Sequence, residues 1–270
     1  MPLLDAVASW PVTTAAVAAL DRGGGIDTAG PTTQPFAWAS VTKIATALAS
    51  WVALEEGTLV LDDAAGPPGS TVRHLLAHAS GLAPDSAAVL APPGERRIYS
   101  NRGFEVVAGM VADRSGLPFE RYLAEAVFEP LGMTATRLTG SPASGAEGPL
   151  DDLVALAREL LAPTLVSAAT LDLATRVTFP GLAGVLPGYG RQDPNDWGLG
   201  VELRGRKSPH WMPQHASPGT FGHFGRAGGF LWVEPDSGIA CACLTDQDFG
   251  PWAIDAWPAL GDAVLDHRRP

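Results

Sequence analysis

The sequence predicts an α+β fold: one antiparallel sheet flanked by N- and C-terminal helices, with an inserted, mostly helical region. Two patterns carry this prediction. Short apolar runs bounded by turn residues lie near both ends of the chain, whereas apolar residues at helical spacing dominate the middle. Strands at the two ends and helices between them favour a sheet built from both ends of the chain. We therefore expect a sheet subdomain from residues 1–56 and 195–270 and a helical subdomain from 57–194.

Turn residues separate the elements expected near the N-terminus. Residues 2–10 are expected to form a short helix that ends before Pro11, because proline cannot continue a helix. Residues 13–20 and 26–29 are mostly apolar runs. The glycine-rich turn between these runs tolerates positive φ angles, so the segment predicts a β-hairpin.

Helical periodicity fills the middle of the chain, and strand patterns return near its end. The apolar residues that follow Ser40 recur at helical spacing as far as Gly57. The other expected helices cover residues 104–111, 119–126, 150–161, 168–177 and 251–265, with Pro/Gly/Ser-rich connections at 140–149 and 180–194. The expected C-terminal strands are 198–203, 221–225, 229–234 and 239–245, with a turn at 235–238.

Charge and hydropathy argue against several classes of function. The chain has 270 residues, 18 basic and 29 acidic, for a net charge of −11. Without a basic run it is a poor partner for nucleic acid or an anionic membrane. The longest nearly apolar stretch, residues 44–54, is about half of what spans a bilayer. The first basic residue is Arg22, so no export signal is indicated and a cytoplasmic protein is expected.

The two cysteines are expected to be buried and reduced. Cys241 and Cys243 lie two positions apart in an apolar run. On a strand their side chains project from the same face and are poorly placed to bridge each other. We expect them to act as small apolar core residues.

The first candidate motif is Ser40-Val41-Thr42-Lys43, at the start of the first long helix. A serine there is usually a cap. Residues three apart share a helix face, however, so the Lys43 ammonium can reach the Ser40 oxygen. A desolvated lysine can take the proton of a serine and activate it as a nucleophile, whereas arginine stays protonated. The sequence has only two lysines, so a lysine at this position is informative.

The second candidate motif is Tyr99-Ser100-Asn101, immediately before an expected helix. Ser100 or Asn101 could simply cap that helix. A phenol beside a lysine could instead act as a general base while the Asn101 amide orients a carbonyl group. Three tyrosines and two asparagines in 270 residues predict about 0.02 chance occurrences of Tyr-x-Asn. The serine and lysine counts predict about 0.1 chance occurrences of Ser-x-x-Lys.

The third candidate motif is His223-Phe224-Gly225, on an expected strand that runs into Arg226. The order Ser-x-x-Lys, Tyr-x-Asn, [Lys/His]-x-Gly resembles the serine hydrolases that include class C β-lactamases, penicillin-binding-protein-like D-alanyl-D-alanine carboxypeptidases and related carboxylesterases. The segment 74–82 also resembles a stretch common in the class C members. The resemblance runs from about residue 38 to residue 245 and implies a β-lactamase/transpeptidase-like fold, with an active-site cleft between the two subdomains.

The resemblance also implies roles for individual residues. Ser40 would be the acylated nucleophile, Lys43 would activate it, and Tyr99 would carry the proton to the leaving group and later activate water. The backbone N–H groups of Ser40 and Arg226 would form the oxyanion hole, and Asn101 would position the substrate. The implied catalytic residues are therefore Ser40, Lys43 and Tyr99, and the implied substrate-binding residues are Asn101, His223, Gly225 and Arg226. Whether Tyr99 or Lys43 is the general base stays open.

Departures from the lactamase pattern bear on the substrate. The third motif of lactamases usually begins with lysine and continues with threonine, which help to bind a carboxylate. This chain has His223 and Phe224, so carboxylate recognition is weaker unless Arg226 supplies it. We expect a small-molecule ester or amide as the substrate. A β-lactam substrate, D-alanyl-D-alanine carboxypeptidase activity, or a non-catalytic ligand-binding protein on the same scaffold are the alternatives.

No cofactor and no metal are expected. His74 and His78 lie four apart on an expected helix, which is a metal-ligand spacing. Leu75 stands where a zinc protease needs a glutamate, and no third ligand is evident. The sequence also lacks Gly-x-Ser-x-Gly, which argues against an α/β-hydrolase nucleophile turn.

Overall fold

The computed structural model describes residues 6–268. Its strands are β1 (Ala15–Asp21), β2 (Ile26–Ala29), β3 (Phe36–Ala37), β4 (Arg137–Leu138), β5 (Ala146–Gly148), β6 (Gly184–Leu186), β7 (Gly190–Gln192), β8 (Glu202–Leu203), β9 (Phe221–Gly225), β10 (Gly229–Glu234) and β11 (Ile239–Thr245). Its helices are the 3₁₀ turn η1 (Ala39–Val41), α2 (Thr42–Glu55), α3 (Val72–Leu76), α4 (Asn101–Ser115), α5 (Phe119–Leu123), the π-helical turn η2 (Ala124–Phe128), α6 (Leu150–Leu161), α7 (Ala168–Ala174) and α8 (Pro251–Arg268).

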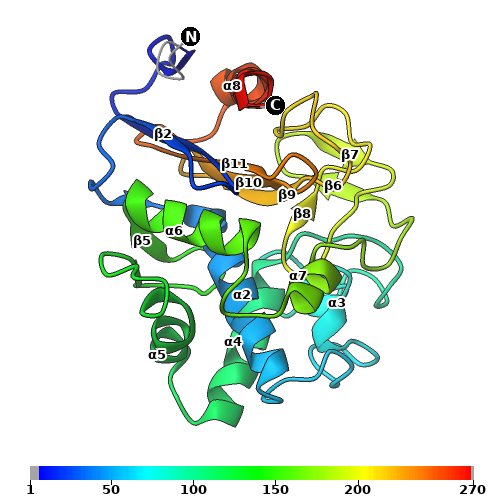
Figure 1. Ribbon diagram of the computed structural model, residues 1–270. Helices are drawn as coiled ribbons and strands as arrows, with labels where there is room; N and C mark the ends of the chain where they lie inside the picture. Colours follow the sequence, from blue (N-terminus) through cyan, green and yellow to red (C-terminus); the bar gives the residue numbers. More distant parts are fainter. Residues whose placement is uncertain (1–5, 269–270) are drawn as a thin grey trace.

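The main sheet has six antiparallel strands in the order β2-β1-β11-β10-β9-β8 (Figure 1). Strand β1 from the beginning of the chain pairs with β11 from its end, with Val17 opposite Cys243. The sheet is therefore built from both ends of the chain, and most helices belong to the sequence between β2 and β8. This arrangement confirms the predicted α+β class and its antiparallel sheet.

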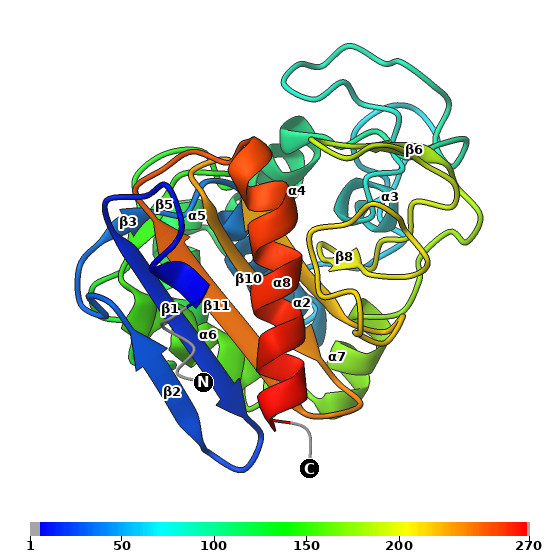
Figure 2. The same cartoon turned by 90° about the horizontal axis from the view of Figure 1, so that it is seen from above.

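Alternating side chains of the sheet bury two apolar layers. On one face, residues such as Val17 and Trp232 pack against Trp257 and Leu260 of α8, which runs across the sheet in Figure 2. The opposite face packs on α2 and α6, which lie below the sheet in Figure 1. Cys241 and Cys243 are free thiols buried on the α8 side, as expected.

The strands with the clearest apolar patterns were predicted correctly. Strands β9, β10 and β11 have the expected bounds, as does helix α6. The prediction for 198–203 was wrong in length: only Glu202–Leu203 is strand, because Gly200 adopts a φ of +95° and turns the chain. Likewise, the expected connections 140–149 and 180–194 contain strand β5 and the hairpin β6–β7.

Two expected helices differ from the structure or extend beyond its described part. The short helix expected at 2–10 lies partly outside the described residues, which begin at residue 6. The helix expected at 168–177 ends at Ala174. The division into subdomains at residues 56 and 194 stays a prediction. No helix in the described part of the chain is long and apolar enough to cross a membrane.

Candidate active site

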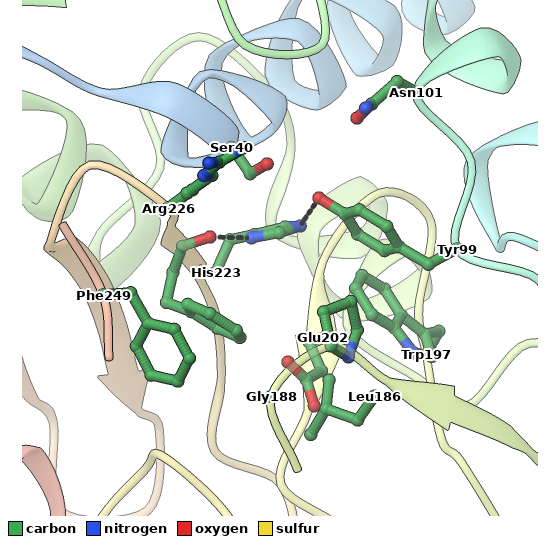
Figure 3. A pocket seen from close by; sticks show the side chains of 12 residues that line it. Ser40, Tyr99, Asn101, Leu186, Gly188, Trp197, Glu202, His223, Arg226 and Phe249 are labelled. Atoms are coloured by element: carbon green, nitrogen blue, oxygen red, sulfur yellow. Dashed lines mark hydrogen bonds between the residues drawn. The ribbon is translucent and has the colours of Figure 1, made fainter. Parts of the chain in front are cut away.

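The three motifs come together where α2, α4 and β9 meet. Ser40 lies in turn η1 just before α2, and Lys43 lies in the first turn of that helix. Tyr99 precedes α4, and Ser100 caps this helix by accepting the N–H of Gly103. A cavity of about 380 Å³ lies among them, with Ser40 and Arg226 on one side and Tyr99 on the other (Figure 3). Its lining residues are Ser40, Tyr99, Asn101, Leu186, Pro187, Gly188, Trp197, Glu202, His223, Phe224, Arg226 and Phe249.

Gly225 lets strand β9 approach the backbone that carries Ser40. A Cβ atom at position 225 would lie 2.3 Å from the Trp38 carbonyl oxygen and 3.3 Å from the Ser40 nitrogen. Any side chain there would push the strand away from η1. Ala39, the residue before the serine, has a φ of +44°, a strained conformation for alanine. The third motif therefore places the backbone of Gly225, the residue before Arg226, beside that of Ser40.

The Lys43 ammonium makes three hydrogen bonds. Its Nζ donates to Ser40 Oγ at 3.3 Å, to Asn101 Oδ1 at 2.6 Å and to the Ala143 carbonyl oxygen at 2.9 Å. The contact with Ser40 is the one that the spacing predicted. The contact with Ala143, from the loop before β5, has no signal in the sequence.

Burial brings the pKa of Lys43 close to neutral pH. The lysine side chain is fully buried at the start of α2. Burial lowers the pKa of Lys43 to about 7, because the charged form is desolvated, and the nearby carboxylates of Asp85 and Glu105 only partly offset this. At pH 7 a large fraction of the amine is therefore neutral.

Tyr99 and His223 both line the cavity, and the polar atoms of their side chains approach each other. The Nδ1 of His223 lies 2.7 Å from the Phe224 carbonyl oxygen, which can only accept, so Nδ1 carries the proton and Nε2 is an acceptor. The Tyr99 hydroxyl lies 3.5 Å from that Nε2 (Figure 3). Burial and the neighbouring Lys43 lower the pKa of His223 to about 3, so the imidazole is neutral. Burial raises the pKa of Tyr99, and a hydrogen bond with Ser40 opposes this only in part, so the phenol keeps its proton.

The Asn101 amide is held from both ends. Its Oδ1 accepts from Lys43, and its Nδ2 donates to Asp85 Oδ1 at 2.7 Å. One N–H of the amide remains for a further partner. Asp85 lies in an irregular loop, so no periodicity in the sequence pointed to it.

The part of the cavity away from Ser40 is mostly apolar, although Glu202 also lines it. Leu186 and Gly188 of the β6–β7 hairpin face Phe249 and Trp197 in Figure 3. Gly188, with a φ of +79°, lies against the Phe249 ring, and a Cβ there would be 2.5 Å from the ring. Arg226 is exposed at the rim near Ser40. The cavity thus combines a polar end at Ser40 with an apolar wall.

A buried charged cluster is centred on Glu202, one of the residues that line the cavity, and no motif in the sequence pointed to it. Glu202 Oε1 accepts from Lys207 Nζ at 2.7 Å and from His210 Nε2 at 2.8 Å, while Oε2 accepts from Trp211 Nε1 at 2.8 Å. Burial alone would raise the pKa of Glu202, but Lys207 and His210 outweigh it and hold this pKa far below its ordinary value. The available signal was the scarcity of lysine: one of the two lysines in the sequence lies five residues after a glutamate, which suggests a specific ion pair.

Lys207→Met is expected to destabilise the fold by about 3–5 kcal/mol, because it leaves the buried Glu202 charge without its cation. Urea unfolding monitored by tryptophan fluorescence measures this loss. The matched control is Arg176→Met, which removes an exposed ion pair with Asp172 and should cost at most about 1 kcal/mol. An unfolding midpoint for Lys207→Met equal to that of the parent would contradict the structural role of the cluster.

The two histidines weighed as metal ligands have different surroundings. Helix α3 ends at Leu76, so His78 is outside it, contrary to the expectation of one helix face. His74 bonds with Thr71 and stacks on Phe179. Within residues 6–268, no group of three or more His, Cys, Asp or Glu side chains is arranged to hold a metal ion.

Comparisons with known proteins agree on one family. The Beta-lactamase family model matches residues 8–265. The crystal structure of a β-lactamase from Mycobacterium bovis is 54% identical, covers 99% of this chain and 100% of its own, and superposes with a TM-score of 0.97. The simvastatin synthase LovD6 mutant from Aspergillus terreus has the same fold at 16% identity, with a TM-score of 0.80 over 99% of this chain and 93% of its own.

A curated relative shows a more limited match. The D-alanyl-D-alanine-carboxypeptidase/endopeptidase AmpH of Escherichia coli (strain K12) is 28% identical over 141 residues. The match covers 38% of this chain and 37% of the relative. The family model spans nearly the whole chain, and the fold and the order of the motifs agree with it: the chain belongs to the Beta-lactamase family.

Proposed function

We propose that this protein is a serine acyl hydrolase that forms an acyl-enzyme on Ser40 and hydrolyses an ester or an amide. The observation that carries the proposal is the set of three hydrogen bonds made by Lys43. When Lys43 loses one proton, its two remaining N–H groups can stay on Asn101 and Ala143. The lone pair then points at Ser40 Oγ, where it can accept the hydroxyl proton.

Acylation follows from these positions. Neutral Lys43 takes the Ser40 proton while Oγ attacks the substrate carbonyl carbon. The backbone N–H groups of Ser40 and Arg226 receive the oxyanion, and each such donor contributes about 3–4 kcal/mol in comparable acyl chemistry. The carbon–leaving-group bond then breaks. The Tyr99 phenol gives its proton to the leaving group and regains one from the Lys43 ammonium.

Deacylation uses the same groups in reverse. A water molecule gives one proton through Tyr99 to Lys43 and attacks the acyl carbonyl carbon, and the Ser40 oxygen leaves with the proton returned by Lys43. Lys43 is assigned as the base because its pKa lies near 7, whereas burial raises the pKa of Tyr99. Tyr99 therefore carries a proton in both steps instead of starting the reaction as a phenolate.

The cavity favours a substrate without a carboxylate. His223 is neutral and its Nε2 is an acceptor, so it does not replace the lysine that binds carboxylates in lactamases. The apolar side chains in the lining offer a substrate no hydrogen bond; they include Phe224, Leu186 and Phe249. An ester or amide with uncharged, apolar substituents therefore suits the cavity.

β-Lactam hydrolysis is the second candidate function. The 54% identical protein is described as a β-lactamase, and the exposed guanidinium of Arg226 lies near Ser40, where a carboxylate could reach it. A peptidase activity is the third candidate, suggested by the partial relative AmpH. Both alternatives use the same acyl-enzyme chemistry on Ser40.

A two-substrate assay separates these candidates. The expected kcat/KM for p-nitrophenyl butyrate exceeds that for a chromogenic cephalosporin by about 10- to 100-fold, the cost of leaving a carboxylate without a good partner. Arg226→Met is the matched variant: it should reduce cephalosporin turnover and leave ester turnover nearly unchanged. A cephalosporin preference would favour the second candidate, and turnover of neither substrate would favour a non-catalytic binding protein.

A further inference from the structure

His78 lies directly behind Tyr99 and has no place in the proposed chemistry. It follows helix α3 and is 1% exposed. Its ring centroid is 4.7 Å from that of Tyr99, and the Trp197 ring stands perpendicular to it at 4.5 Å. The histidine therefore fills the space on the side of Tyr99 that faces the core.

His78 also holds the backbone on both sides of Tyr99. Its carbonyl oxygen accepts the N–H of Ile98 at 2.9 Å, and its Nδ1 accepts the N–H of Ser100 at 3.0 Å. Residues 98 and 100 are the two chain neighbours of Tyr99. One residue thus fixes the path of the main chain before and after the phenol.

His78 bears two energetic costs in this arrangement. His78 has a φ of +54°, which is uncommon for a residue with a side chain. Because Nδ1 is an acceptor, the proton lies on Nε2, and this buried atom has no hydrogen-bond partner among the described residues. Strained backbone and unpaired buried donors persist where the surroundings require them, and they gather at functional sites.

Neighbouring hydrogen bonds also fix the segments on either side of these His78 contacts. Arg97 donates to the Ala77 carbonyl oxygen at 2.7 Å, and the Ser100 hydroxyl donates to the Ala83 carbonyl oxygen at 2.8 Å. Burial lowers the pKa of His78 well below its ordinary value, and Lys43 adds to this. Both effects favour the neutral imidazole, in which Nδ1 accepts from the Ser100 N–H.

We propose that His78 is a positioning residue that sets the Tyr99 phenol at the reacting atoms, through the Nδ1 acceptor bond to Ser100 and the packing of its ring against the phenol. The inference rests on the proposed function, because it assigns His78 a role only through Tyr99. A displacement of about 1 Å in a catalytic group can cost about 100-fold in rate.

The test compares variants that separate the acceptor from the ring. His78→Phe keeps a ring packed against Tyr99 and removes Nδ1, so it should lower kcat on p-nitrophenyl butyrate by about 100-fold with little change in KM. His78→Asn keeps an acceptor near the Nδ1 position and tolerates positive φ, so its kcat should stay within about tenfold of the parent. His78→Gln, whose amide reaches the Nε2 position instead, should lose activity as His78→Phe does, and this comparison remains usable if His78→Phe does not fold.

A double-mutant cycle with Tyr99→Phe distinguishes positioning from a general structural role. If His78 acts through Tyr99, His78→Phe should change kcat by less than about threefold in the Tyr99→Phe background. The inference is overturned if His78→Phe costs the same factor in both backgrounds, or if it leaves the kcat of the parent unchanged. A Tyr99→Phe variant with full activity would also overturn it. Acylation of Ser40 is measured separately, so the proposed acyl-enzyme would be unaffected by that result.

Discussion

Ser40→Ala is expected to lower kcat on p-nitrophenyl butyrate by about 10⁴-fold or more, with KM changed far less. The hydroxyl is the atom that forms the bond to the substrate, and the nucleophile and its bases act as a unit, so the other residues cannot compensate. Steady-state hydrolysis followed at 405 nm measures the loss, with the purified variant checked for the fold by circular dichroism.

Ser50→Ala is the matched control for this prediction. Ser50 lies on the same helix α2, is buried, and donates only to the Thr46 carbonyl oxygen. Its removal should leave kcat within about threefold of the parent, because the hydroxyl is remote from the cavity lining. If Ser40→Ala retained more than a tenth of the parental kcat, Ser40 would not be the nucleophile.

Lys43→Arg is expected to lower kcat/KM by about 10³-fold or more, although the positive charge is kept. A guanidinium stays protonated in proteins, so it cannot take the Ser40 proton, and general-base catalysis is worth about 10²- to 10⁴-fold. The pH profile gives the sharper measurement. With the pKa of Lys43 lowered to about 7, kcat/KM of the parent should rise about tenfold per pH unit below pH 7 and level off above it.

The sign of this dependence follows from the role of the amine. Lys43 is active as a base only when neutral, and its neutral fraction grows as the pH rises through its pKa. The Lys43→Arg variant should lose this rise in its residual activity. A parental profile that is flat from pH 5 to pH 9, or one that falls with rising pH, would remove Lys43 from the base role.

Local patterns were sufficient for much of the fold and for the first contact in the site. Strands β9 to β11 are short apolar runs bounded by turn residues, and helix α6 has a continuous helical period, so their bounds followed from the sequence. Ser40 and Lys43 are three apart on one helix, so a contact between them needed no knowledge of the tertiary fold. The antiparallel sheet followed because strand-like runs lie at both ends of the chain.

Contacts made by loops could not be predicted in the same way. The Ala143 carbonyl that binds Lys43 and the Asp85 carboxylate that binds Asn101 belong to irregular segments, where backbone direction depends on long-range packing. The Glu202–Lys207 pair was missed for a related reason: a bend at Gly200 shortens strand β8, and the turns after it bring the lysine back over the glutamate. Periodicity carries no information about such returns of the chain.

The most direct test of the central claim is the mass of the covalent intermediate. The protein is mixed with p-nitrophenyl butyrate, quenched with acid within the first turnovers, digested and measured by mass spectrometry. The expected result is a butyryl group on the peptide that contains Ser40, accompanied by a burst of p-nitrophenol, with both absent in Ser40→Ala. Steady turnover of the ester without acylation of that peptide, or with the acyl group on another residue, would contradict an acyl-enzyme at Ser40.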